Sequence, residues 1–318
     1  MAELSHGVAA VLSSLKGGDF LSSSDLTSEQ TVALLDLASQ LKQGDRRIDL
    51  GNRVLGLIFT KASTRTRVSF QVAMARLGGQ TVDLNPTVTQ LGRGEPLEDT
   101  ARVLSRFCDA LAVRTYGQDE LESYANWSSI PVINALTDLE HPCQALADFL
   151  TMREVFGCLK GQTLAYVGDG NNVAHSLMIC GALLGVNVRI GCPSGFEPLP
   201  DLVSKARDLA IAGAQIELTN DPLETVKGAN ALYTDVWASM GQEEEQGLRE
   251  KAFEGFCLDQ KLLSEASANA IVLHCLPAHR GEEITSDVIE SASSRVFDQA
   301  ENRLHVQQAL LAALLGGL

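Results

Sequence analysis

The sequence predicts an α/β fold made of two parallel-sheet βα domains that are linked by helices. Two observations carry this prediction. At 318 residues the chain is longer than one hydrophobic core usually supports. Short apolar runs typical of buried strands alternate along it with segments of helical period, which is the pattern of a parallel sheet covered by helices. We expect a first domain over residues 1–150 and a second over residues 151–318.

The first half of the chain contains four expected strands. A polar entry segment over residues 1–27 precedes a helix at about 28–42, where Thr27 and Gln30 can form a capping box. The apolar runs that follow predict strands at 54–59, 80–85, 109–113 and 131–135. Helices are expected at 68–77, 97–107, 119–127 and 142–156. The last of these begins with a proline, whose missing N–H costs nothing at that position.

The second half repeats this plan. Strands are expected at 163–167, 187–191, 215–218, 231–235 and 270–274, with a shorter one at 295–298. Helices are expected near 173–184, 202–212, 224–227 and 261–265. Residues 237–254 break the rhythm and predict a long loop followed by a short helix. The chain closes with an amphipathic helix at about 302–315, which we expect to pack back onto the first domain.

Composition excludes several classes of function. The net charge of −15 argues against binding to nucleic acid. The N-terminus lacks the features of a signal peptide, and no run approaches the ~20 apolar residues of a membrane span. Seven cysteines without a Cys-x-x-Cys pair, and six histidines without a His-x-x-x-His pair, give no metal signature. We therefore expect a cytoplasmic protein with reduced thiols and no metal.

The turn after the first strand, residues 63–67, reads Ser-Thr-Arg-Thr-Arg. A strand that leads into a helix places unpaired backbone N–H groups, and the positive end of the helix dipole, at the carboxyl edge of the sheet. Hydroxyls and two guanidiniums add donors there and no acidic group. The alternative is a helix N-cap with solvated arginines. So many donors in one turn favour a site for a small charged oxyanion such as phosphate.

Polar side chains also follow other expected strands, where ligands of open parallel sheets bind. The first domain places Arg114 and residues 141–144, His-Pro-Cys-Gln, at such ends. The second places residues 169–172, Asp235 and residues 274–277, His-Cys-Leu-Pro, at such ends. An amide, a carboxylate and a thiol there suit an amino group. Simpler alternatives exist for three single residues, namely helix caps for Asn172 and His141 and a core position for Cys275.

Residues 168–170, Gly-Asp-Gly, invite comparison with dinucleotide-binding proteins because they follow a strand and open a helix. The match is partial, since Val173 stands where the third glycine belongs. The next strand, moreover, ends at 189–193 without the acidic residue that would bind a ribose. We therefore do not expect a nicotinamide-dependent dehydrogenase.

Four segments together resemble the ornithine carbamoyltransferases. They are residues 63–67, 141–144, 235–241 (Asp-Val-Trp-Ala-Ser-Met-Gly) and 274–277. The resemblance spans essentially the whole chain, in order and at the family's spacing. It implies two Rossmann-like domains, a carbamoyl-phosphate-binding first domain and an L-ornithine-binding second domain. It also implies transfer of the carbamoyl group of carbamoyl phosphate to the δ-amino group of L-ornithine, giving L-citrulline and phosphate. A homotrimer or a multiple of trimers, without metal or organic cofactor, follows from the same resemblance.

The resemblance also implies residue roles. Matches to the carbamoyl phosphate site are Ser63, Thr64, Arg65, Thr66, Gln90, Arg114, His141, Gln144, Cys275, Leu276 and Arg303. Matches to the ornithine site are Asn172, Asp235, Ser239 and Met240. Arg114 and His141 would polarise the carbamoyl carbonyl, while Gln144 would hold its NH₂ group. A free alkylammonium titrates near about 10.4, so the acceptor amine must lose a proton. Our hypothesis is that a thiolate at Cys275, oriented by Asp235, accepts it.

Related acceptors are the main alternatives. Aspartate carbamoyltransferases complete their site with a loop lysine, but residues 62–159 contain no lysine and the corresponding loop carries Gln90. Enzymes for N-acetylornithine and succinylornithine depart from the Ser-Met-Gly pattern that this chain keeps at 239–241. A binding module without catalysis is disfavoured because no catalytic position is missing. The sequence leaves open whether the reaction serves synthesis or breakdown of arginine.

Overall fold

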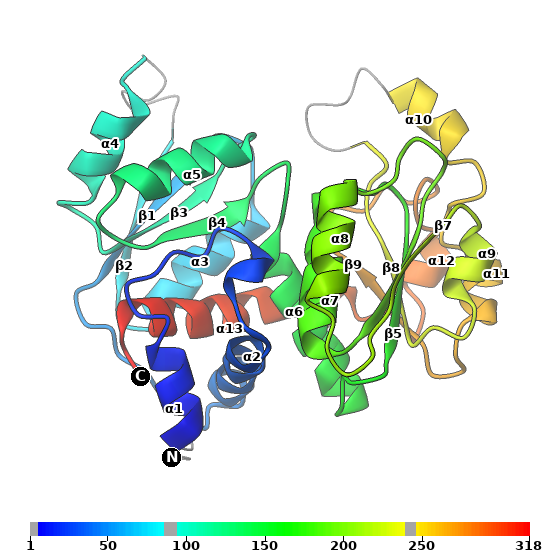
Figure 1. The fold of residues 1–318 in the computed structure, drawn as a ribbon, viewed down its shortest axis with the longest axis horizontal. Coiled ribbons are helices and arrows are strands. Elements are labelled where there is room, and N and C mark those ends of the chain that lie inside the picture. The colour runs from blue at the N-terminus through cyan, green and yellow to red at the C-terminus, as the bar shows by residue number, and fades with distance from the viewer. Residues whose placement is uncertain (1–5, 86–93, 239–245) are drawn as a thin grey trace. The chain divides into compact units, whose positions relative to one another are not determined.

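The protein folds into two compact units (Figure 1). The structure, a computed structural model, describes residues 6–85, 94–238 and 246–318. Unit 1 consists of Met1–Leu150 and Glu301–Leu318, and unit 2 consists of Thr151–Ala300. The chain passes between the units within helix α6 (Pro142–Phe156) and again within helix α13 (Val296–Leu315). No helix in the described part of the chain is both long and apolar enough to cross a lipid bilayer.

Unit 1 contains a four-stranded parallel sheet in the order β2-β1-β3-β4. Its strands are β1 (Val54–Phe59), β2 (Gln80–Leu84), β3 (Ala110–Arg114) and β4 (Val132–Leu136). β3 is buried along its whole length, as expected for a central strand. The strand order reverses between β1 and β3, and the carboxyl ends of these two strands therefore form the place where such sheets bind ligands.

The helices of unit 1 cover both faces of this sheet. They are α1 (His6–Ser13), α2 (Ser28–Gln43), α3 (Arg65–Arg76), α4 (Leu97–Leu104), α5 (Gln118–Trp127) and the first part of α6. α4 and α5 lie on one face, and α3 and the C-terminal part of α13 lie on the other (Figure 1). The predicted capping box of α2 is confirmed, since Thr27 and Gln30 bond reciprocally to each other's backbone N–H.

Unit 2 contains a five-stranded parallel sheet in the order β7-β6-β5-β8-β9. Its strands are β5 (Thr163–Val167), β6 (Asn187–Gly191), β7 (Ile216–Thr219), β8 (Ala231–Thr234) and β9 (Ile271–His274). Its helices are α7 (Asn172–Leu184), α8 (Pro200–Asp208), α9 (Pro222–Val226), α10 (Gln246–Ala252), α11 (Gln260–Glu265) and α12 (Ser286–Ile289). α7 and α8 cover one face of the sheet, and α9, α11 and α12 cover the other (Figure 1). The order reverses between β5 and β8, which marks the ligand-binding edge of this unit.

Two expectations about secondary structure are wrong. The strand expected at 295–298 does not form, because α13 begins at Val296 and only Ser294 pairs with Val272 as an isolated bridge. A short apolar run cannot be told from the first turn of a helix by periodicity alone. The second concerns the described part of the entry segment, residues 6–27, for which no regular structure was expected. It contains α1 and the 3₁₀ turn η1 (Ser23–Asp25), and its Phe20 pairs with Ile133 beside β4.

Candidate active site

The loop between β1 and α3 presents the predicted anion-binding turn at the carboxyl edge of the unit 1 sheet. Helix α3 begins at Arg65, three residues earlier than expected, so Thr66 and Arg67 lie in its first turn. Thr64 stands at the N-cap but has helical backbone angles and makes no side-chain capping bond. The alternative of an ordinary helix cap therefore has no support, and the first N–H groups of α3 keep their donor capacity for an anion.

Three guanidiniums gather around this turn. Thr66 is fully buried, and its Oγ1 accepts a hydrogen bond from Arg303 Nη2 and a longer one, 3.4 Å, from Arg114 Nη1. Arg65 contributes a third guanidinium, whose Nε is buried and lacks a hydrogen-bond partner within the described residues. A buried donor of this kind indicates a ligand, because unpaired buried polar groups are uncommon and costly. The structure thus brings together residues that are up to 238 positions apart in the sequence.

His141 lies inside this positive cluster. Its imidazole is buried, and burial is the main reason that the pKa of His141 falls well below its usual value. The charges of Arg303, Arg114 and Arg65 lower the pKa further. Its backbone carbonyl also accepts hydrogen bonds from the first turn of α6, so the alternative role as a helix cap applies to the main chain. The side chain is a neutral imidazole that can share a hydrogen bond with a carbonyl oxygen.

We expect His141 to stay uncharged from about pH 8 down past about pH 6.5, where a free histidine titrates. Because the folded chain binds this proton more weakly than the unfolded chain, His141 removes stability progressively as the pH falls below about 6.5. Nitrogen NMR of the imidazole, assigned through His141→Asn, should show one neutral form over this range. A titration midpoint near the ordinary value would contradict the arrangement.

Gln144 follows in the first turn of α6 and is almost fully buried. Its Nε2 donates a 2.8 Å hydrogen bond to Oδ1 of Asp148, one turn further along the helix. The sequence predicts Gln144 as a site residue but gives no prediction for Asp148. The spacing of four residues on one helix face was the available signal.

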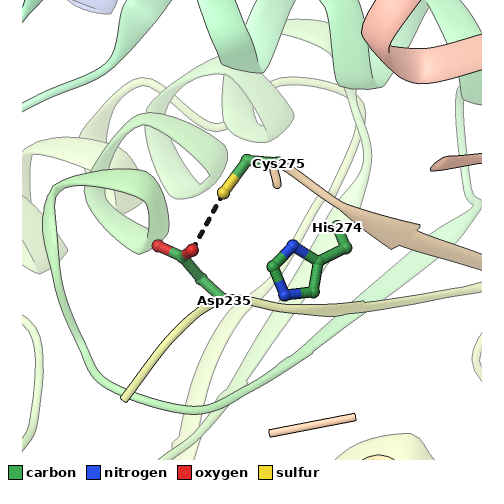
Figure 2. A group of neighbouring side chains, drawn as sticks. All are labelled: Asp235, His274 and Cys275. Carbon is green, nitrogen blue, oxygen red and sulfur yellow. Dashed lines mark hydrogen bonds between the residues drawn. The ribbon is translucent and has the colours of Figure 1, made fainter. Parts of the chain in front are cut away.

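The predicted amino-acid site of unit 2 is built around Asp235, which directly follows β8 (Figure 2). The thiol of Cys275, after β9, donates to Asp235 Oδ1 at 2.9 Å. The amide of Asn171 donates to Oδ2, also at 2.9 Å. Asn171 Oδ1 caps helix α7, so the helix cap is this residue and not Asn172. Asn172 is the adjacent first residue of α7.

His274 lies beside this pair, but its two ring nitrogens contact other residues. Its Nδ1 accepts the N–H of Leu276 at 2.8 Å, and its Nε2 is 3.1 Å from Oε1 of buried Glu283. Asp235, His274 and Cys275 carry metal-ligand atoms within 4.8 Å of one another. Since both ring nitrogens are engaged, a metal would have to displace one of these contacts. The contacts instead hold Leu276, whose φ of +57° is unusual for a leucine.

A buried ion pair that the sequence did not predict supports the same edge of unit 2. Arg249 of α10 contacts Asp169 after β5, with Nη1 and Oδ2 2.8 Å apart. The same nitrogen donates to the carbonyl of Trp237 at 2.7 Å. Arg249 therefore links α10 to Trp237 after β8 and to Asp169 after β5. No local sequence pattern predicts that Arg249 contacts a residue 80 positions earlier in the chain.

The Gly-Asp-Gly segment after β5 has a packing role. A Cβ on Gly170 would stand 2.3 Å from the backbone nitrogen of Pro198, and the N–H of Gly170 donates to Phe196 O at 2.9 Å. The glycine is needed where two backbone segments approach closely. This explains the partial motif without a dinucleotide.

Three predicted site residues, Gln90, Ser239 and Met240, lie outside the residues that the structure describes. The remaining predictions fall into two groups. One gathers on unit 1 around Thr66, and the other gathers on unit 2 around Asp235. The first group offers positive donors and the second offers a carboxylate, a thiol and amides.

Comparisons with known proteins match both halves of the chain. Residues 18–154 match the model of the carbamoyl-P binding domain of aspartate/ornithine carbamoyltransferase. Residues 160–314 match the model of the Asp/Orn binding domain of the same family.

Full-length relatives and solved structures agree with these matches. The chain is 77% identical over 318 residues to an ornithine carbamoyltransferase of Prochlorococcus marinus (strain MIT 9313), covering 100% of both chains. It is similar to the structure of ornithine carbamoyltransferase from Pyrococcus furiosus, with a TM-score of 0.92 and 49% identity over 96% of this chain and 99% of that one. The corresponding structure from Gloeobacter violaceus gives a TM-score of 0.87 and 54% identity, covering 94% and 98%.

Proposed function

The chain belongs to the aspartate/ornithine carbamoyltransferase family, and we propose that it transfers the carbamoyl group of carbamoyl phosphate to the δ-amino group of L-ornithine. The products are L-citrulline and phosphate. The observation that carries this function is the gathering of Arg65, Arg114 and Arg303 at Thr66, in a chain that is 77% identical over its full length to an ornithine carbamoyltransferase.

Unit 1 binds carbamoyl phosphate in this proposal. The phosphate group accepts hydrogen bonds from the N-terminal N–H groups of α3. It also accepts from the side chains of Ser63 and Thr64 before the helix, of Arg65 and Thr66 in its first turn, and of Arg303. Arg114 and neutral His141 donate to the carbamoyl oxygen and stabilise the negative charge that grows on it in the transition state. The lowered pKa of His141 supports this role, because an uncharged imidazole can donate without first adding a further positive charge to the cluster. Gln90 is assigned to the same substrate.

Unit 2 binds ornithine, through Asn172, Asp235, Ser239 and Met240. Cys275 lies beside Asp235, with Sγ and Oδ1 2.9 Å apart. Our hypothesis is that a thiolate at Cys275, oriented by Asp235, takes one proton from the δ-ammonium group, which leaves the amine free to attack the carbamoyl carbon. The thiol that results can donate to Asp235, whose carboxylate remains the partner of the α-ammonium group. Leu276 is assigned to the same reaction centre.

Acceptor choice tests this function. Ornithine presents an α-ammonium for Asp235 and a chain of three methylenes that ends in the reacting amine. Lysine is one methylene longer, and a misplacement of about 1 Å can cost about 100-fold in rate. We expect kcat/KM for ornithine to exceed the values for lysine, putrescine, N-acetylornithine and aspartate by at least about 100-fold. A comparable value for N-acetylornithine or aspartate would instead support the alternative acceptors.

The biological setting is also part of the proposal. We assign the protein to the cytoplasm and to arginine biosynthesis, and seven free cysteines support a reducing compartment. We further propose a homotrimer or a multiple of trimers. Edge strand β2 and the adjoining helix α3 support assembly through unit 1, because Val82 and Val68 leave about half of their surface exposed there.

A further inference from the structure

Asp148 is a buried carboxylate that has no role in the carbamoyl transfer proposed above. It lies on α6, one turn after Gln144, and its Oδ1 accepts the 2.8 Å hydrogen bond from Gln144 Nε2. Both side chains are almost completely buried. Burying a carboxylate is costly because the group loses its contacts with water, and hydrogen bonds such as the one from Gln144 are needed to offset this cost.

The contact decides which way the amide of Gln144 faces. The two ends of a glutamine amide have nearly the same shape, and either end could point toward a ligand. An ionised carboxylate only accepts hydrogen bonds. Asp148 therefore holds the NH₂ end of Gln144, and Oε1 has to face away from it.

The Oε1 atom of Gln144 is buried and has no hydrogen-bond partner within residues 6–85, 94–238 and 246–318. The backbone N–H of Gln144 donates to the carbonyl of His141 at 3.0 Å, which places the two residues in the same turn. In addition to the effect of burial, the charges of Arg303, Arg114 and Arg65 in turn lower the pKa of His141. An unsatisfied acceptor thus stands next to a cluster that otherwise consists of donors.

Carbamoyl phosphate matches this pattern in one specific way. Its phosphate and carbonyl oxygens only accept hydrogen bonds, whereas its NH₂ group can only donate. The guanidiniums and Thr66 can bind the oxygens, but an acceptor is required for the NH₂ group. An acyl phosphate with a methyl group in that place would leave Oε1 of Gln144 unpaired, and a buried unpaired acceptor is penalised strongly.

We propose that Asp148 is a positioning residue for substrate specificity: it holds the Gln144 amide so that Oε1 accepts from the carbamoyl NH₂ group and selects carbamoyl over acyl phosphates. The inference rests on the proposed function, because it takes carbamoyl phosphate as the ligand of unit 1. Beyond that function, Asp148 receives a role without touching the substrate, and the amide of Gln144 receives a defined orientation.

Two stable analogues that differ only at this group test the proposal. Phosphonoacetamide carries the NH₂ group, and acetonylphosphonate carries a methyl group in its place. Calorimetry without acceptor gives the ratio of their dissociation constants. We expect the wild-type protein to favour phosphonoacetamide by about 10- to 100-fold, the range for a hydrogen bond to an otherwise unpaired buried acceptor. Asp148→Asn frees the amide to turn, so the preference should fall about tenfold while acetonylphosphonate affinity changes little.

Leu150→Met is the matched control, since it alters a buried residue on the same helix at nearly constant volume and should keep the wild-type ratio. In a Gln144→Leu background, Asp148→Asn should not change the ratio further. A wild-type protein that binds both analogues equally would overturn the carbamoyl site itself. A clear wild-type preference that survives Asp148→Asn, or an equal weakening of both analogues, would overturn the role of Asp148 alone.

A measurement on the unaltered protein covers the case in which Asp148→Asn does not fold. The side-chain NH₂ group of Gln144 should show high order parameters in nitrogen NMR, and its signals should shift little when phosphonoacetamide binds, because Asp148 holds this end of the amide throughout. Oε1 carries no proton and gives no such signal. Low order parameters, or a large shift of the NH₂ protons on binding, would show that the amide is not held in this orientation and would overturn the proposal.

Discussion

Replacing Arg65 with alanine should lower kcat/KM for carbamoyl phosphate by about two to four orders of magnitude. Arg65 lies at the start of α3, and its buried Nε has no partner within the described residues. A phosphate would receive charge-assisted hydrogen bonds from this guanidinium, each worth about 1.5–3 kcal/mol. Two such bonds correspond to the expected loss.

Steady-state kinetics with each substrate varied in turn measures this effect. KM for carbamoyl phosphate should rise and kcat should fall, because the phosphate is both bound and released as the leaving group. Arg67→Ala is the matched control. It removes the same charge two residues away, but Arg67 is already paired with Asp83 and stacked on Phe59. A KM for carbamoyl phosphate that does not change in Arg65→Ala would refute the anion site.

The sheets were predictable because most strands are short apolar runs, while β2, β6 and β7 alternate polar and apolar residues. The bounds of β1, β5 and β6 agree with the expected 54–59, 163–167 and 187–191. The segment at 295–298 reads Arg-Val-Phe-Asp and was expected to form a strand, yet it leads into a helix of 20 residues. Its conformation is set by the apolar positions further along α13, which are buried, and not by its own four residues.

The site was predictable where residues sit at strand ends and unpredictable where they act through a partner. Sequence placed Asp235 and Cys275 at neighbouring strand ends, and the structure joins them by a hydrogen bond. The sequence named Asn172 as the possible helix cap, whereas Asn171 caps α7, because the cap depends on where the backbone turns into the helix. The depressed pKa of His141 depends partly on Arg303, 162 positions later, and contacts of that kind exist only in the folded chain.

Asp235→Asn should lower kcat/KM for ornithine by about three orders of magnitude. Asp235 is only 6% exposed, and its two oxygens accept from Cys275 and from Asn171. The substitution removes the negative charge that would hold an ammonium group, and it replaces one acceptor by a donor that must face the thiol or the Asn171 amide. Losing a charge-assisted contact costs about 1.5–3 kcal/mol, and loss of the carboxylate that orients Cys275 for proton transfer adds to this.

The effect should fall on ornithine alone. Phosphonoacetamide should bind Asp235→Asn with wild-type affinity, since the charged and polar groups proposed to hold it, among them Arg65, Arg114 and Gln144, belong to unit 1. Asp208→Asn removes the same charge from an exposed position of α8 in the same unit and should behave like the wild-type protein. If Asp235→Asn retained kcat/KM for ornithine within about tenfold, Asp235 would not be the ammonium partner.

The pH profile then separates binding from proton transfer. In Cys275→Ser the hydroxyl can still donate to Asp235, but serine does not ionise as a thiol does, so the pair loses one of its two exchangeable sites. We expect the acid limb of the kcat profile to move to higher pH, because more of the acceptor amine must then lose its proton to solvent before attack. KM for ornithine should change less than kcat. An unchanged profile would leave Asp235 as an ammonium partner and remove Cys275 from the proton transfer.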